Sequence, residues 1–349
     1  MIRIPDSIRK YVRWRALVGV YVALFLVYQV FTFFYIPPER HAKSKVIYIR
    51  PKTKFLTISR QLEDEGIIRS SFKFAILAKL TGSVNRIRAG EYELSPSMLP
   101  REVLNKLVNG RVIQHMVTIP EGYNIYQIAD TLAKEGLIKK QEFLARAFDQ
   151  DLISSLGVEG SSLEGYLFPD TYEFWRDMQA EDVLRKMTNR FKKIYSQNYA
   201  EEAKRRGLSM HEVVTLASII EKETGIPDER RLISAVFHNR LRRGMPLQAD
   251  PTVIYGLRDF NGDLTRKDLR TPTPYNTYML KGLPPGPIAC PGEAAIKAVL
   301  NPVKKRVLYF VSKNDGSHHF SSTLKGHQRA VALYQKKPAS DVPASDTTD

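Results

Sequence analysis

The stretch that decides the fold of this chain runs from Val213 to Asp250 and reads VVTLASIIEKETGIPDERRLISAVFHNRLRRGMPLQAD. Six of the eight residues at 213–220 are apolar and cover every face of a helix, so the pattern predicts a buried helix. Glu221 extends this helix, and an amphipathic helix over 230–242 follows after a turn. The stretch therefore predicts a buried helix that carries carboxylates at its end, followed by a second helix and a polar loop.

Glu221 is the candidate general acid in this stretch. Removing a carboxylate from water disfavours its charged form and raises its pKa, as proton donation near neutral pH requires. The alternative is that Glu221 only begins a polar last turn together with Lys222 and Glu223. Glu223 is two positions further on, at about 100° per residue, so it points nearly opposite to Glu221 and cannot flank the same bond. A second catalytic carboxylate, where the chemistry needs one, is then Asp250.

Polar and aromatic loops follow the second helix and are typical of the walls of a binding cleft. Amide, hydroxyl and aromatic groups gather at 247–252 and 271–278, and a proline-rich segment follows at 282–288. Asp250 is also interpreted as the N-cap of a short helix, with Pro251 at its first position. The candidate substrate-binding residues are Asn239, Gln248, Asp250, Thr252, Tyr255, Tyr275, Asn276 and Tyr278.

A pattern of one strand and two short helices occurs twice before this stretch. The first copy has an alternating strand at 46–50 and apolar helical spacing at 55–65 and 71–80. Seven of its residues return 70 positions later with the same or a similar side chain: Ile49, Ile58, Leu62, Glu65, Gly66, Ile67 and Ile68 match Ile119, Ile128, Leu132, Glu135, Gly136, Leu137 and Ile138. We interpret this as an internal repeat of the LysM kind. The alternative is that L-x-x-E-G-[IL]-I is a common way to end a helix.

Further elements are predicted from local patterns. A strand at 90–94 and a helix at 101–108 lie between the two copies, and a basic amphipathic helix is predicted at 180–198. The aromatic segment 163–174 predicts a packed loop and strand, and a core role is favoured over stacking on sugars. A last helix at 291–300 and a hairpin that pairs 307–311 with 318–320 complete the expected elements. The Ser/Pro/Asp-rich tail at 336–349 is expected to be disordered.

The N-terminal segment Ala16–Ile36 contains no charged residue. At 1.5 Å per residue it is long enough to span a hydrocarbon core of ~30 Å, and it exceeds the ~7–15 apolar residues of a cleaved signal. It predicts a single uncleaved membrane anchor, and the alternative is a buried core helix. An excess of positive charge before it favours a cytoplasmic N-terminus, so the rest of the chain is expected outside the inner (cytoplasmic) membrane. The charges are those of Arg3, Arg9, Lys10, Arg13 and Arg15.

The net charge of +16 and the pI of about 9.7 predict a polyanionic partner. With a membrane anchor, anionic lipid and cell-wall polymers fit this charge, and nucleic acid does not. Other chemistries lack a pattern. His211 and Glu212 lack the second histidine of a zincin motif, Cys290 has no nucleophile signature, and neither a P-loop nor a dinucleotide fingerprint occurs. We therefore predict no metal and no cofactor.

Four segments together resemble the MltG/YceG-like family of endolytic murein transglycosylases. They are LEGYLFPDTYEF (163–174), LASIIEKET (216–224), VFHNRLRRGMPLQADPTVIYGL (236–257) and PYNTYMLKGLPPGPI (274–288), and the resemblance extends over about residues 40–335. It implies an α+β protein with a transmembrane N-terminal part (1–40), a LysM-like domain (41–112) and a lytic transglycosylase catalytic domain (113–335). The catalytic domain would include the second copy of the repeat, at 116–150.

The resemblance implies a role for the first acidic residue of the E-K-E motif, which is Glu221. It would protonate the glycosidic oxygen between N-acetylmuramic acid and N-acetylglucosamine in peptidoglycan. As a carboxylate it would then take the proton of the muramic C6 hydroxyl, which attacks its own anomeric carbon and leaves a 1,6-anhydro end. Because this nucleophile is tethered to the reacting sugar, no second carboxylate is needed.

The expected substrate is the peptidoglycan glycan strand, and the expected role is to limit the length of nascent strands in the periplasm. The resemblance also implies peptidoglycan synthases (penicillin-binding proteins) as partners. Two alternatives remain: a hydrolase that uses Glu221 with Asp250, and a non-enzymatic scaffold that binds the wall.

Overall fold

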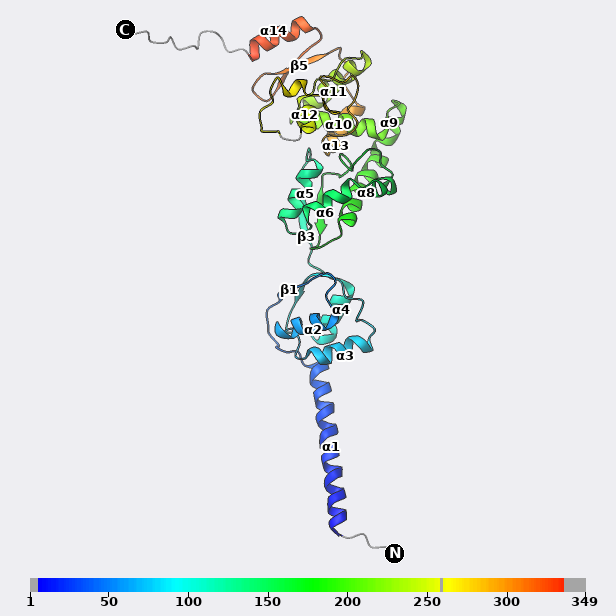
Figure 1. Cartoon of the computed structure of the whole chain (residues 1–349), viewed down its shortest axis with the longest axis vertical. Coiled ribbons are helices and arrows are strands. Elements are labelled where there is room, and N and C mark those ends of the chain that lie inside the picture. The colour runs from blue at the N-terminus through cyan, green and yellow to red at the C-terminus, as the bar shows by residue number, and fades with distance from the viewer. Residues whose placement is uncertain (1–5, 258–259, 336–349) are drawn as a thin grey trace, which may run out of the picture. The chain divides into compact units, whose positions relative to one another are not determined.

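The computed structural model describes residues 6–257 and 260–335, and of residues 6–13 and 16 it describes the backbone only. Within these residues the chain combines helices with three two-stranded sheets, which pair β1 with β2, β3 with β4 and β5 with β6 (Figure 1). The predicted mixture of helix and sheet is confirmed. The tail predicted at 336–349 lies outside the described residues.

Contacts divide the chain into two units. One unit runs to His115 and includes Glu173–Asp177, and the other holds Met116–Tyr172 and the residues from Met178 onward. The division therefore cuts through strands β3 (His115–Thr118) and β4 (Thr171–Phe174). Each unit is described by itself.

The first unit begins with helix α1 (Asp6–Tyr35). Its segment Leu17–Tyr35 has a mean hydropathy of 2.1 and is only 6% buried by the rest of the protein. At 1.5 Å per residue, this segment is long enough to cross the hydrocarbon core of a membrane. The helix is thus consistent with the single anchor predicted at Ala16–Ile36.

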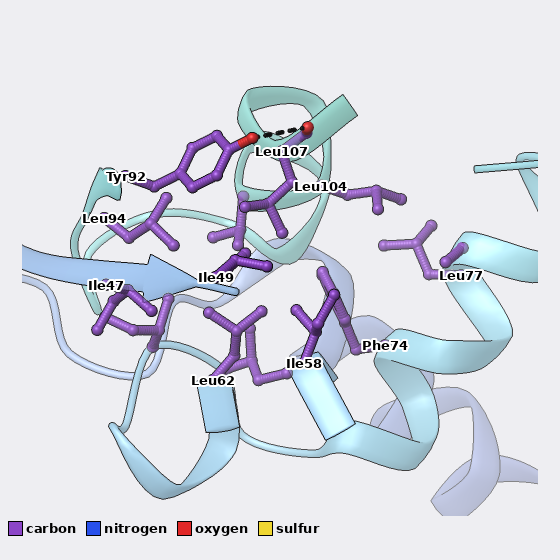
Figure 2. Close-up of a cluster of buried hydrophobic side chains, with 14 of the residues drawn as sticks. Ile47, Ile49, Ile58, Leu62, Phe74, Leu77, Tyr92, Leu94, Leu104 and Leu107 are labelled. Carbon is purple, nitrogen blue, oxygen red and sulfur yellow. Dashed lines mark hydrogen bonds between the residues drawn. The ribbon is translucent and has the colours of Figure 1, made fainter. Parts of the chain in front are cut away.

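The rest of the first unit packs helices against a small sheet. Strand β1 (Lys45–Ile49) pairs antiparallel with β2 (Gly90–Leu94), and alternate side chains of both strands point into one core (Figure 2). Three helices close this core: α2 (Phe55–Asp64), α3 (Ser71–Leu80) and α4 (Pro100–Asn109). The hydroxyl of the buried Tyr92 donates to the Arg88 carbonyl at 2.7 Å and also lies 3.3 Å from the Leu107 carbonyl. Gly110 ends α4 in the left-handed region, at φ 62°.

The segment Glu173–Asp177 is held on the first unit by polar contacts. Arg176 Nη1 donates to Glu91 Oε1 on β2 at 2.9 Å, and its guanidinium lies 4.6 Å from the ring centre of Tyr48 on β1. The Tyr48 hydroxyl donates in turn to the Asp177 carboxylate. A segment distant in sequence is thereby fastened to both strands of the first sheet.

The two copies of the repeat have the same local structure. Helix α5 (Ile125–Lys134) lies 70 positions after α2 (Phe55–Asp64), and α6 (Lys140–Ala147) follows it as α3 follows α2. Gly66 and Gly136 occupy the left-handed region at φ 75° and 67°. The chain then turns back in the same way, since Ile67 N donates to Leu62 O at 2.9 Å and Leu137 N donates to Leu132 O at 3.1 Å. This local structure agrees with the predicted repeat, and its likeness to LysM stays a prediction.

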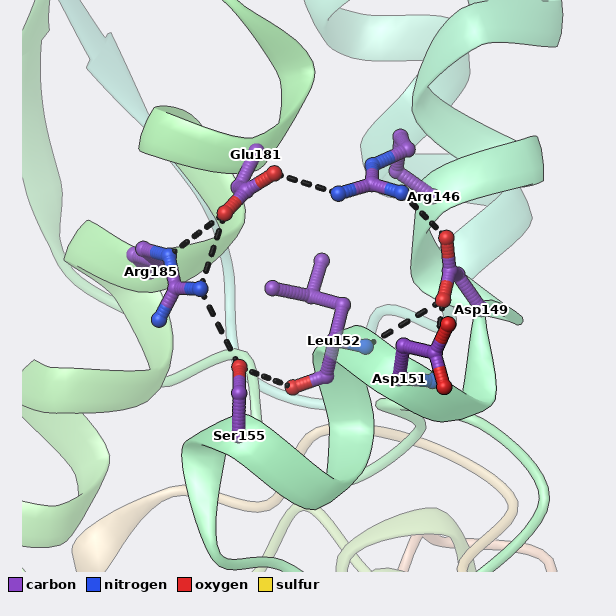
Figure 3. Close-up of polar contacts among 7 residues, drawn as sticks. All are labelled: Arg146, Asp149, Asp151, Leu152, Ser155, Glu181 and Arg185. Atoms are coloured by element: carbon purple, nitrogen blue, oxygen red, sulfur yellow. Dashed lines mark hydrogen bonds and ion pairs between the residues drawn. The ribbon is translucent and has the colours of Figure 1, made fainter.

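The middle of the second unit is joined by both core and polar contacts. The aromatic segment 163–174 is mostly buried, including Tyr166, Phe168 and Tyr172, which agrees with the predicted core role. Helices α7 (Gln150–Leu156), α8 (Ala180–Asn198) and α9 (Ala200–Arg205) follow this part of the chain. Figure 3 shows a ring of polar contacts that joins α6, α7 and α8 through Arg146, Asp149, Ser155, Glu181 and Arg185.

The remainder of the second unit is built around helix α10 (Met210–Glu223). A capping box of Ser209 and Glu212 starts this helix, and all eight residues at 213–220 are buried, as predicted. Helices α11 (Pro227–Arg242) and α13 (Glu293–Leu300) pack against it. The other elements are α12 (Asp250–Gly256), the 3₁₀ helix η1 (Asp268–Arg270), the antiparallel hairpin β5 (Tyr309–Ser312) and β6 (His318–Ser321), and α14 (Leu324–Tyr334).

Candidate active site

Glu221, near the end of α10, is held by protein groups. Its side chain is 7% exposed, Oε2 accepts from the Gly292 N–H at 3.0 Å, and Oε1 lies 3.6 Å from Arg230 Nη2. Burial raises the pKa of Glu221, as expected, and the negative charge of Glu121 adds to the rise, while the Gly292 N–H and Arg230 oppose it. Since Gly292 precedes α13, this carboxylate links the end of α10 to the start of α13. Its hydrogen bond to Gly292 and its ion pair with Arg230 fit a positioning role.

Glu223 has different surroundings. Its side chain is half-buried, and no group in the described part of the chain donates a hydrogen bond to it. Burial raises the pKa of Glu223 to about 8, the negative charge of Asp250 adds to the rise, and Arg240 opposes it. The raised pKa favours the protonated form of this half-buried carboxyl group near neutral pH. A proton donor needs these properties.

Arg240 organises the backbone around Glu223. It is 7% exposed on α11, and Nε donates to Leu308 O at 2.7 Å. Its Nη1 donates to Leu247 O at 2.8 Å and to Gln248 Oε1 at 3.1 Å. One buried guanidinium thus fixes the loop before α12 and the start of the β5–β6 hairpin.

The loop before α12 brings two predicted substrate-binding residues to Glu223. Asp250 is exposed and accepts from the Tyr278 hydroxyl at 2.6 Å, and Gln248 is exposed in the left-handed region at φ 50°. The charges of Asp250 and Glu223 both raise the pKa of Tyr278 further, beyond the larger effect of its burial. Asp250 and Tyr278 therefore lie near Glu223, and Gln248 contacts Arg240, whose charge also acts on Glu223.

The predicted N-cap role of Asp250 is wrong. The helix begins one residue earlier than expected, so Ala249 is the N-cap and Asp250 is the first helical residue. The side chain of Asp250 makes no cap hydrogen bond and turns to Tyr278 instead. It is consequently free of a backbone role and belongs to the polar surface around Glu223.

Three other predicted binding residues are used within the protein. Thr252 is fully buried and shares a hydrogen bond of 2.8 Å with Thr277, and Asn276 donates to Thr271 O at 2.8 Å. The Asn239 amide donates to Val307 O at 2.7 Å and to Lys305 O at 2.9 Å. These residues position the loops that carry Gln248, Asp250 and Tyr278.

Tyr255 and Tyr275 form an aromatic pair that leads to a buried carboxyl group. Their ring centres are 4.8 Å apart, and the Tyr255 hydroxyl donates to Glu164 Oε2 at 3.1 Å. Glu164 also accepts from the Ile125 N–H, at the start of α5, at 3.1 and 3.2 Å. Burial raises the pKa of Glu164 to about 7, against the effect of these donors. Glu164 was not singled out from sequence, because nothing in the aromatic segment 163–174 shows that its carboxyl group accepts hydrogen bonds from Ile125 and Tyr255.

Glu164→Ala is expected to lower the free energy of unfolding by about 2–4 kcal/mol, because the Ile125 N–H and the Tyr255 hydroxyl lose their buried acceptor. Thermal and urea unfolding followed by circular dichroism would measure this change. Glu201→Ala, at an exposed position on α9, is the matched control and is expected to stay within about 0.5 kcal/mol of the parent. Equal stability of the two variants would contradict the role of Glu164.

From sequence, Glu223 was considered only as a partner of Glu221, and Arg240 was not singled out. Helical geometry correctly placed Glu223 away from Glu221, but sequence does not show which face of α10 meets the 247–250 loop. Arg240 is part of a basic run with Arg242 and Arg243, and only the fold shows that it alone of the three is buried. The described residues contain no group of three or more histidine, cysteine or acidic side chains that could hold a metal ion. The expected absence of metal and cofactor stays a prediction.

Comparison with known proteins gives consistent matches. A model of the YceG-like family matches residues 47–333. An endolytic murein transglycosylase of Bacillus subtilis (strain 168) is 35% identical over 315 residues, which cover 85% of this chain and 87% of that protein. One of Streptococcus pneumoniae (serotype 2, strain D39) is 32% identical over 307 residues, and the match spans 79% of this chain but only 55% of that protein. A solved YceG-like protein of Listeria monocytogenes aligns with a TM-score of 0.58 and 34% identity, over 83% of this chain and 100% of that chain.

Proposed function

This chain belongs to the YceG-like family, and we propose that Glu223 is the proton donor with which it cleaves peptidoglycan glycan strands as an endolytic murein transglycosylase. The observation that carries this proposal is the state of Glu223: unpaired, half-buried and with a pKa raised to about 8. Glu221, by contrast, is engaged by Gly292 and Arg230. The role predicted for Glu221 from sequence stays a prediction, and the geometry favours its neighbour.

The proposed reaction uses one carboxyl group twice. Protonated Glu223 gives its proton to the glycosidic oxygen, and the bond from that oxygen to the anomeric carbon of N-acetylmuramic acid breaks. The resulting carboxylate takes the proton of the C6 hydroxyl of the same sugar, whose oxygen bonds to the anomeric carbon and forms a 1,6-anhydro ring. No water is consumed, and Glu223 ends protonated as it began. The intramolecular nucleophile makes a second catalytic carboxylate unnecessary.

We propose that Gln248, Asp250 and Tyr278 contact the glycan directly. Asp250 and Tyr278 lie near Glu223 and the exposed Gln248 contacts Arg240, and their carboxylate, phenol and amide groups suit the hydroxyl and N-acetyl groups of sugars. Asp250 has a further effect, since its charge adds to the effect of burial in raising the pKa of Glu223. Tyr255 and Tyr275 stay candidates for contacts further along the strand, while Thr252, Asn276 and Asn239 act through the loops that they hold.

Mass spectrometry of products from intact glycan strands tests the lytic reaction. We expect muropeptides with 1,6-anhydro ends, which are lighter by one water than the products of hydrolysis. Products with reducing ends alone would instead support a hydrolase in which Asp250 activates water opposite Glu223. The proximity of these two carboxylates is the observation that keeps this second function open.

We place the chain in the inner membrane as a single-pass protein with its N-terminus inside and its catalytic unit outside. The apolar helix Leu17–Tyr35 and the excess of positive charge before it support this orientation. A catalytic unit tethered there would meet newly made strands and limit their length. Contact with peptidoglycan synthases stays a prediction from the family resemblance.

A further inference from the structure

Helix α3 is apolar on two opposite faces, and the protein covers only one of them. Phe74, Leu77 and Ala78 point into the core of the first unit and are buried. On the other side Phe72, Ile76 and Leu80 are 73%, 44% and 79% exposed. These three residues follow one another at every fourth position, so they form one continuous stripe. A helix that is apolar all round is normally covered on every side, by protein or by lipid.

The membrane anchor fixes where this stripe lies. Lys73, next to Phe72, donates from Nζ to Gln29 Oε1 of α1 at 2.8 Å and to Gln29 O at 3.3 Å. Phe33 of α1 is 4% exposed and belongs to the core of the first unit, together with residues of α3. Arg69, just before α3, donates to Pro37 O at 2.8 Å. Helix α3 is therefore held against the last turns of α1.

The depth of this contact matches a lipid boundary. Gln29 lies about 9 Å before Tyr35 along the axis of α1, at 1.5 Å per residue. Helices that lie in the membrane interface bury their apolar face by about 5–10 Å. If α1 spans the membrane with its apolar segment, a helix bonded to Gln29 lies at that level. The exposed Lys79 gives it a basic group for anionic headgroups.

The second copy of the repeat provides an internal comparison. Its helix α6 buries Phe143 and Ala147 where α3 buries Phe74 and Ala78, so the two helices align at an offset of 69. At this offset the stripe of Phe72, Ile76 and Leu80 is replaced by Gln141, Ala145 and Asp149. The copy that adjoins the anchor has an apolar outer face, and the copy without an anchor has a polar or small one. The apolar stripe is thus a property of the membrane-proximal copy and not of the repeated unit.

We propose that the stripe of Phe72, Ile76 and Leu80 inserts into the outer leaflet of the inner membrane, with the exposed Lys79 at the phosphate groups of anionic lipids. Helix α3 then lies in the membrane interface as a second contact beside the anchor. This inference rests on the proposed anchor but not on the proposed catalytic residues.

Site-directed spin labelling of the full chain in vesicles of phosphatidylcholine and phosphatidylglycerol tests this proposal. Single cysteines replace Ile76, Ala145 as the matched position in the second copy, and Leu24 within the anchor. The native Cys290 is buried, and burial raises the pKa of its thiol well above the usual value, so it is expected to stay unlabelled. Collision of each label with oxygen and with a water-soluble nickel chelate reports its depth.

For labels at Ile76 and Leu24 we expect collisions with oxygen to exceed collisions with the chelate severalfold, as in lipid. For the label at Ala145 we expect collisions with the chelate to exceed those with oxygen, as in water. A water-exposed label at Ile76 beside a lipid-exposed label at Leu24 would overturn the proposal while leaving the anchor intact. Water exposure at both positions would overturn the anchor and the proposal together. An immobilised Ile76 label that couples to labels on other copies would overturn it in favour of contact between protein copies.

Discussion

Glu223→Gln is expected to lower the rate of glycan cleavage by about 10²–10⁴-fold, the usual contribution of a general acid. Glutamine has nearly the same size but no proton to give, so the half-buried site keeps its shape. Release of anhydro-ended muropeptides from purified strands, quantified by mass spectrometry, measures the loss. Glu221→Gln is the matched control on the same helix. Strong loss with Glu221→Gln and little with Glu223→Gln would assign the acid to Glu221 after all.

The pH dependence of cleavage gives a second readout for Glu223. Because the donor must be protonated, the rate is expected to fall as the pH rises through about 8. The folded-state pKa of about 8 lies above the ordinary value of 4.5, so folding favours the protonated form. The stability contributed by this proton is fully present below about 4.5 and is lost as the pH rises through about 8. Glu223→Gln removes that loss, so it is expected to unfold at a higher temperature than the parent at pH 8.

Arg240→Met is expected to have the largest effect on stability, about 3–5 kcal/mol. The substitution keeps the apolar stem but leaves the carbonyl groups of Leu247 and Leu308 without their donor. For a unit of this size, this loss corresponds to a fall in melting temperature of about 6–20 °C. Differential scanning calorimetry would measure it.

Arg243→Met, at an exposed position one residue past α11, is the control for the loss of one positive charge. It is expected to change stability by no more than about 0.5 kcal/mol. The positive charge of Arg240 lowers the pKa of Glu223, so its removal is expected to raise that pKa further. In folded Arg240→Met protein, the fall in cleavage rate at alkaline pH should therefore begin at a higher pH than in the parent. An unchanged pH dependence would contradict the electrostatic link between these residues.

Periodicity predicted the elements of this fold well where one face must be buried. Helix α3 was expected at 71–80 and α8 at 180–198, and both have these bounds in the structure. The repeat was visible because an apolar set and a glycine with positive φ return together, as in Gly66 and Gly136. Such signals are local, so one sequence is enough to reveal them.

The candidate site was only partly predictable, because its properties arise from contacts between distant segments. Sequence indicated the end of α10 and the loop at 247–252. Sequence could not show that Gly292 and Arg230 contact the Glu221 carboxylate, since these residues reach it only when α11 and α13 have packed against α10. Nor could it show that Asp250 raises the pKa of Glu223. Which of the two glutamates on α10 is the better candidate proton donor depends on the residues that pack around each side chain.

The segment Glu173–Asp177 makes the first unit discontinuous in sequence. The chain leaves this unit after His115, returns at Glu173 and leaves again after Asp177. Within the unit, Tyr48 donates to the Asp177 carboxylate and Arg176 donates to Glu91. A fragment that ends at His115 therefore lacks part of its own unit, and it is expected to be less stable than the same unit in the full chain.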